Sequence, residues 1–106
     1  MPHYMFKGEY SQAGIRGVQE AGATSRREVV EQLFSSLGGR LESIYWTFGE
    51  DDFVVIGELP DNPAATAAAM TVAAGGGSSI STTVLLTESD IDEARGRKAD
   101  FRAPGR

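Results

Sequence analysis

Three residues of this chain, His3, Tyr45 and Asp52, are candidates for proton transfer. His3 is the single histidine, and imidazole is the side chain that ordinarily titrates near neutral pH. Tyr45 offers a hydroxyl and Asp52 a carboxylate, and both groups can serve as general acids or bases. The structural alternatives are a partly exposed histidine near a terminus, an interface tyrosine and an ordinary turn carboxylate.

A second group of residues is suited to binding a small molecule. Such pockets are mostly apolar with a few polar groups, and the sequence offers Ser43 and Tyr45 together with Val54 and Ile56. The same residues fit an interface between two subunits equally well, with the tyrosine hydroxyl at its rim. Both interpretations of this surface remain open at the level of the sequence.

Arg26 is a separate candidate for ligand binding. It stands with Arg27 at the start of an expected helix, where positive charge opposes the helix macrodipole at a cost of up to about 1 kcal/mol. Binding an anion or a carboxylate would offset this unfavourable interaction with the helix macrodipole. The alternatives are a solvated helix end and an ion pair with Glu31.

Metal and phosphate sites are not expected. The chain has no cysteine, which excludes disulfides, thiolate-bound zinc and iron–sulfur clusters. The run Glu50–Asp52 could bind a hard cation, but it lacks EF-hand spacing and suits a turn. The glycines at 75–77 follow a helix and precede a strand, the reverse of a phosphate loop. We therefore predict no metal site and no cofactor.

The first half of the chain contains strand and helix signals that would position these residues. Residues 3–10 alternate with a period of two, which predicts a strand. Ser11 can cap a short helix interrupted by glycines, and Ser25 with Glu28 forms a capping-box pattern for a longer one. That helix has an apolar stripe and should end at Gly38. The stripe consists of Val29, Val30, Leu33, Phe34 and Leu37.

The second half predicts two more strands, an alanine-rich helix, a fourth strand and a short final helix. Strands are expected over 40–48 and 53–59, joined by a hairpin through the acidic run. Asn62 and Pro63 should open an alanine-rich helix that ends at the glycines, and 79–86 should form a fourth strand. Thr87 with Asp90 predicts a short final helix. Residues 95–106 hold five basic side chains and one acid and are expected to be a disordered basic tail.

The order of elements predicts one α+β domain over residues 1–94. Strand, helix, strand, strand, helix, strand is the split βαβ arrangement of ferredoxin-like sandwiches, a four-stranded antiparallel sheet with helices on one face. A symmetrical hairpin pairing Phe48 with Phe53 would divide the central residues between two faces. Ile44, Trp46, Phe48, Phe53 and Val55 would share the first face, and Ser43, Tyr45, Thr47, Val54 and Ile56 the second.

The second face is more apolar than a solvated sheet face should be. Burying Tyr45, Val54 and Ile56 would each contribute about 1.5 to 3 kcal/mol. A second copy of the same sheet would cover them. We therefore predict a homodimer packed sheet to sheet.

Several segments together resemble the GYD domain family. They are Gly38–Gly39, Phe48–Ile56, Leu59–Asn62 and Thr82–Thr87, and the resemblance covers roughly residues 3–94. Asp51 stands where the family's name-giving stretch has tyrosine, while Gly49 and Asp52 are kept. The resemblance implies a ferredoxin-like fold related to the dimeric α+β barrels, and it supplies no catalytic residues.

Charge and composition limit the remaining function classes. The net charge of -5 argues against a nucleic-acid binder, and no segment approaches the roughly 20 apolar residues of a membrane span. The opening Met1-Pro2-His3 is unlike a signal peptide, so a cytoplasmic location is expected. The sequence predicts a homodimeric small-molecule-binding or interaction module without catalysis. The alternative is a small enzyme, a cofactor-poor monooxygenase or isomerase, which fold analogy alone supports.

Overall fold

The computed structural model describes residues 1–47 and 49–106 and has four strands and four helices in that part of the chain. Phe48, which the sequence assigned to the end of a strand, lies outside the described residues. The elements are β1 (His3–Tyr10), α1 (Gln12–Ala21), α2 (Ala23–Ser36), β2 (Arg40–Trp46), β3 (Phe53–Glu58), α3 (Asn62–Ala74), β4 (Ser78–Leu85) and α4 (Glu88–Arg95).

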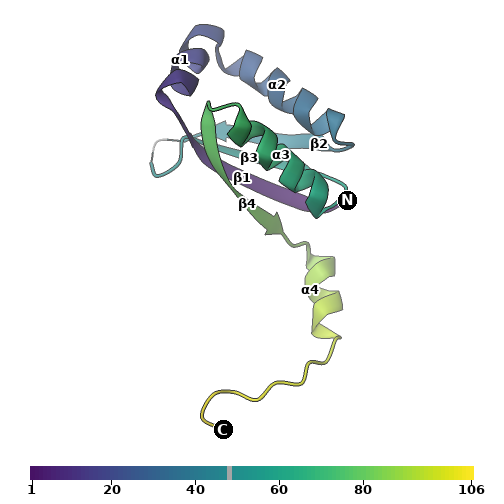
Figure 1. The fold of residues 1–106 in the computed structure, drawn as a ribbon. Coiled ribbons are helices and arrows are strands. Elements are labelled where there is room, and N and C mark those ends of the chain that lie inside the picture. The colour runs from purple at the N-terminus through teal and green to yellow at the C-terminus, as the bar shows by residue number, and fades with distance from the viewer. Residues whose placement is uncertain (48) are drawn as a thin grey trace.

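The strands form one antiparallel sheet in the order β2-β3-β1-β4. Figure 1 shows α2 and α3 over the same face of this sheet, while α4 and the C-terminal residues extend away from it. The prediction of an α+β fold with a four-stranded antiparallel sheet is therefore confirmed. We call the face under the helices the helix face and the opposite one the open face.

Alternation along the strands places the core on the helix face. Tyr4 and Phe6 of β1 are buried there with Val55 of β3, and Phe34 of α2 meets the Phe6 ring edge to face at 5.8 Å between centroids. Ala65 and Ala68 bury the thin side of α3 against them. Alanine suits this position because a small side chain lets a helix lie close to the sheet.

Two helix starts differ from the sequence predictions. The capping box of Ser25 and Glu28 is wrong, because α1 and α2 are joined by the single residue Gly22, whose φ of 84° turns the chain so that α2 begins at Ala23. Asn62 is not the cap of α3, because Asp61 accepts the hydrogen bond from the Ala64 amide instead. The N-cap of α2 therefore lies three residues before the predicted one, and the N-cap of α3 lies one residue before it.

The apolar stripe of α2 is also narrower than expected. Phe34 is buried and Val30, Leu33 and Leu37 are half-buried, whereas Val29 is exposed. Val29 faces α1 and a hollow between the two helices rather than the core. The expected stripe is therefore confirmed except at this residue.

The β2–β3 hairpin has a register two residues away from the symmetrical one. Trp46 pairs with Phe53, Tyr45 with Val54 and Ile44 with Val55. An even shift leaves every side chain on its face, so the predicted division of the two faces holds for the described residues. A bulge between Leu41 and Ser43 adds Glu42 to β2 without a partner of its own in β3.

The final helix α4 is held by local interactions. Thr87 and Asp90 form the predicted capping box, with the Thr87 amide donating to Asp90 Oδ2 at 2.9 Å. Hydrogen bonds from Thr87 lower the pKa of Asp90 below its ordinary value. None of the helices in the described part of the chain is long and apolar enough to cross a membrane.

Candidate functional site

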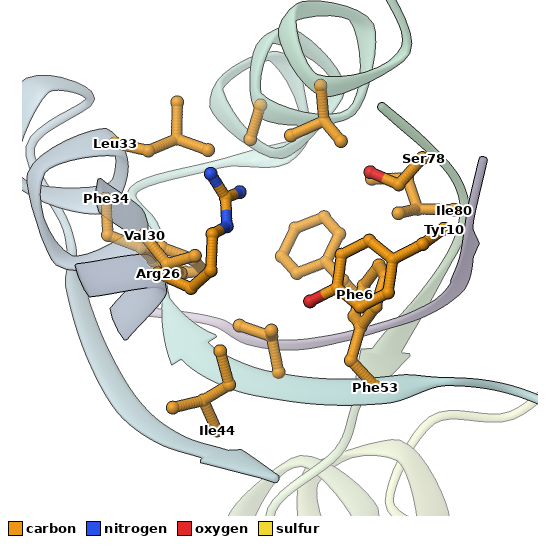
Figure 2. A pocket seen from close by; sticks show the side chains of 13 residues that line it. Phe6, Tyr10, Arg26, Val30, Leu33, Phe34, Ile44, Phe53, Ser78 and Ile80 are labelled. Carbon is orange, nitrogen blue, oxygen red and sulfur yellow. The ribbon is translucent and has the colours of Figure 1, made fainter. Parts of the chain in front are cut away.

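An apolar hollow of about 50 Å³ lies between α2, α3 and the helix face of the sheet (Figure 2). Its lining is mostly aromatic and aliphatic, with Phe6, Phe34, Phe53 and Val55 among the core residues that face it. Three polar residues also line it, namely Tyr10, Arg26 and Ser78. We call this space the inner hollow.

A glycine in β1 makes room for one wall of the inner hollow. A Cβ on Gly8 would lie 2.8 Å from the Phe53 ring and 2.0 Å from the Ser79 carbonyl oxygen. Because Gly8 has no side chain, the Phe53 ring can lie over the backbone of Gly8 and pack against the Tyr10 ring. The two ring centroids are 5.0 Å apart. This packing places Tyr10 at the edge of the hollow.

A second hollow of about 330 Å³ adjoins the first, between α1, α2 and the start of β4. Tyr10, Arg26 and Ser78 line both spaces. We call the second space the outer hollow and these three residues the seam. The outer hollow is at the low end of the roughly 300 to 1,000 Å³ typical of ligand pockets.

Arg26 is the one charged residue among those that line the two hollows. Figure 2 shows its guanidinium turned toward the inner hollow. Within the described residues its side chain makes no ion pair or hydrogen bond, whereas Arg27 pairs with Glu31 at 2.9 Å on the exposed side of α2. The ion pair considered as the alternative for these two arginines therefore belongs to Arg27.

Tyr10 brings a second polar group to the seam, and its hydroxyl also turns toward the hollow in Figure 2. The indole Nε1 of Trp46 donates to the Tyr10 hydroxyl oxygen at 3.0 Å. A hydroxyl that accepts from one partner can still donate its own proton to another. Tyr10 is therefore oriented by Trp46 and retains a donor for a ligand.

The other predicted ligand residues lie on the opposite side of the sheet. Tyr45 is 66% exposed on the open face, and its neighbours Val54, Ile56 and Ser43 are half-buried there. The structure thus brings these four residues together, as predicted, but separates them from Arg26 by the thickness of the sheet. Tyr10 and Trp46 were not identified as site residues from the sequence.

His3 lies in a polar cluster at one end of the open face. Its Nδ1 is 2.7 Å from Glu42 Oε1 and its Nε2 is 3.7 Å from Glu58 Oε1, and Arg40 Nε is 2.7 Å from Glu58 Oε2. The bulge in β2 brings Glu42 to this position. One possible ligand atom from each of His3, Glu42 and Glu58 lies within 4.8 Å of the other two, which is close enough to bind a cation. His3 already pairs with both carboxylates.

The acidic run between β2 and β3 has structural roles. Asp52 accepts from the Tyr10 amide at 2.9 Å, and its own amide donates to the Gly8 carbonyl at 2.7 Å. Asp51 lies 3.9 Å from Lys7 Nζ. Asp52 therefore holds β1 beside the hairpin, at the end of β1 opposite to His3.

The fold and these surfaces define a small α+β domain with an apolar space between its helices and its sheet. The family model for the GYD domain matches residues 4–94, so the chain belongs to the GYD domain family. No match was found among curated proteins or among solved structures.

Proposed function

We propose that the chain is a homodimeric small-molecule-binding module without catalysis, with its ligand between the helices and the sheet. The observation that carries this proposal is the meeting of two hollows at Arg26 and Tyr10. An apolar space with a few convergent polar groups is the usual form of a small-molecule site. Of the ligand-binding candidates from the sequence, Arg26 lines this space, whereas Ser43, Tyr45, Val54 and Ile56 lie on the open face.

The outer hollow provides a variant that tests binding. A Cβ on Gly17 would meet no atom within 4 Å, so this position has open space on the side of the outer hollow. Gly17→Leu should fold, because leucine is a better helix former than glycine, and its side chain should occupy the outer hollow. Ala13→Leu adds the same side chain at an exposed position of α1 that lines neither hollow.

The binding experiment is a thermal-shift screen of small organic molecules on the full chain, followed by amide chemical-shift mapping of each hit. A site ligand at about 100 times its Kd stabilises the fold by about 2.7 kcal/mol. We expect shifts at residues of α1, α2 and the start of β4, weakened by Gly17→Leu and kept by Ala13→Leu. Hits that map elsewhere, or a screen without hits, would contradict the proposal and favour an interaction module.

We further propose that two copies pair through their open faces in a ferredoxin-like arrangement related to the dimeric α+β barrels. The strand order β2-β3-β1-β4 supports this arrangement. The open face carries Tyr45, Val54 and Ile56 at its centre, and the register adds Met5 beside Ile56. A solvated sheet face is normally polar, so this apolar centre favours a covered face.

The dimer is tested by Val54→Glu. Lys7 lies opposite Val54 in β1, so the new carboxylate gains an oppositely charged neighbour within the monomer. We expect light scattering after gel filtration to give twice the chain mass for the wild type and one chain mass for this variant. Met70→Glu, on an exposed part of α3, should stay dimeric. A monomeric wild type would overturn the proposed interface.

The enzyme alternative, a cofactor-poor monooxygenase or isomerase, gains no support from the positions of its candidate residues. His3 lines a hollow beside α4, Tyr45 lies on the open face and Asp52 holds the hairpin. Proton transfer would require at least one of them within hydrogen-bonding reach of a bound substrate. The hollow proposed for the ligand contains none of the three.

A further inference from the structure

We infer that the ligand of the two hollows is a small monocarboxylic acid with an apolar body, its carboxylate held at the seam by Arg26 and Tyr10. This inference rests on the proposed small-molecule function and specifies the class of ligand. It follows from the donors at the seam, the charge of the lining and the volumes on either side.

The seam presents hydrogen-bond donors that the described residues leave free. The Arg26 guanidinium carries five N–H donors and no acceptor. Among the described residues it forms no ion pair and no side-chain hydrogen bond. Tyr10 already accepts from Trp46, which leaves its hydroxyl proton to donate. The Arg26 guanidinium offers donors only and an ionised carboxylate accepts only, so the two groups are complementary.

The charge of the lining favours one negative charge on the ligand. Arg26 is the single charged residue that lines the hollows, so one carboxylate would be balanced and a phosphate dianion would not. The rest of the domain opposes larger anions as well. Residues 1–94 hold five basic and fourteen acidic side chains, a formal charge of -9. A polyanion would be repelled by this surface, whereas a monoanion at Arg26 meets a local positive charge.

The two volumes set the size and polarity of the ligand body. The inner hollow is small and lined by aromatic side chains such as Phe6 and Phe53, which suits a compact apolar end. The outer hollow is larger and bordered by Gly14, Gly17 and Val18 of α1. A ligand whose carboxylate lies at the seam can place an apolar end in the first space and any extension in the second.

The test compares an acid with its uncharged analogue on the full chain. Phenylacetate and phenylacetamide have nearly the same shape, but the amide lacks the charge and replaces one acceptor oxygen with a donor. We expect phenylacetate to bind about ten- to hundredfold more tightly, as a charge-assisted hydrogen-bonded pair would give. Titrations followed by amide chemical shifts also report where each compound binds.

Two arginine variants provide the matched comparison. Arg26→Gln should remove most of the preference for the acid, while leaving the affinity for phenylacetamide within about threefold, because the apolar contacts remain. Arg27→Gln removes the same charge one residue later, from an arginine already paired with Glu31, and should leave both affinities unchanged. Tyr10→Phe should weaken the acid by a smaller factor, since it removes one neutral donor.

The outcomes separate this inference from the proposed function. Equal binding of the acid and the amide in the hollows, or equal losses from Arg26→Gln and Arg27→Gln, would overturn the carboxylate assignment and leave a small-molecule site. Absence of any binding to the hollows by either compound, together with a screen without hits, would overturn both. Acid binding that maps to the open face would also contradict the inference.

Discussion

At the scale of single residues, Tyr4 connects the core to the start of α3. Its ring is buried among the residues of the helix face, and its hydroxyl donates to Asn62 Oδ1 at 2.7 Å. Burial raises the pKa of Tyr4, with a smaller contribution from the negative charge of Asp61. The folded chain therefore holds the phenolic proton more tightly than the unfolded chain does.

This raised pKa predicts a loss of stability in alkali. The contribution of Tyr4 is complete below the ordinary tyrosine pKa of about 10 and is lost as the pH rises through the higher folded pKa. We expect the urea midpoint of the wild type to fall more steeply with alkaline pH than that of Tyr4→Phe. At neutral pH the variant should be less stable by about 1 kcal/mol, because it lacks the bond to Asn62.

Tyr10 and Tyr45 are present in both the wild type and Tyr4→Phe, so they do not account for a difference between the two pH profiles. Parallel pH profiles for the wild type and Tyr4→Phe would contradict the assignment of the alkaline loss to Tyr4. Ultraviolet difference spectra of the phenolate follow the titration directly. The wild type should show a tyrosine that ionises at a higher pH than free tyrosine does, and Tyr4→Phe should lack this signal.

At the scale of elements, α1 contains two glycines with opposite surroundings. A Cβ on Gly14 would lie 1.9 Å from the Gly77 carbonyl oxygen, so α1 approaches the turn before β4 closely only because this side chain is absent. The same approach allows the Ser11 amide to donate to the Gly77 carbonyl at 2.9 Å. Gly17, one turn later, has open space in the outer hollow.

Alanine at these two positions should therefore change stability in opposite directions. Gly17→Ala should raise the free energy of unfolding by about 0.5 to 1 kcal/mol, because alanine loses less backbone entropy in a helix. Gly14→Ala gains the same propensity but must displace α1 from Gly77, and we expect a net loss of about 1 to 3 kcal/mol. Chemical denaturation of both variants measures the difference, and equal shifts would refute the close packing of α1.

At the scale of the whole molecule, the C-terminal part projects from the domain. Figure 1 shows α4 and the residues after it extending away from the sheet, and the longest dimension of the molecule is 57 Å. Residues 95–106 carry five basic groups and one acid, a formal charge of +4 beside a domain of -9. Among residues 96–106 no helix or strand is formed.

Truncation after Arg95 tests which part of the molecule is required for folding and association. We expect the melting temperature of the truncated chain to stay within about 2 °C of the full chain, because these residues bury little apolar surface. The dimer should persist as well, since the proposed interface lies on the sheet. A truncated chain that becomes monomeric would assign the association to the C-terminal segment instead.

The sequence by itself determined which segments form strands and helices, the antiparallel sheet and the division of its two faces. Alternation along β1 and the Thr87 capping box are local patterns, and local patterns are decided by residues a few positions apart. The starts of α2 and α3 were placed wrongly because a neighbouring residue forms the N-cap in each case. Gly22 precedes α2, and Asp61 caps α3. The hairpin register was wrong by two residues, yet the faces were preserved.

Only the tertiary structure decided where the candidate site lies. Tyr10 is oriented by Trp46, which is 36 residues away, and Gly8 makes room for the Phe53 ring from another strand. Arg26 was a candidate from its place in the helix, but only the packed structure shows that its side chain lines the two hollows while Arg27 pairs with Glu31. Such a site depends on contacts between distant segments, and local residue patterns report only residues a few positions apart, so they do not reveal which distant side chains meet.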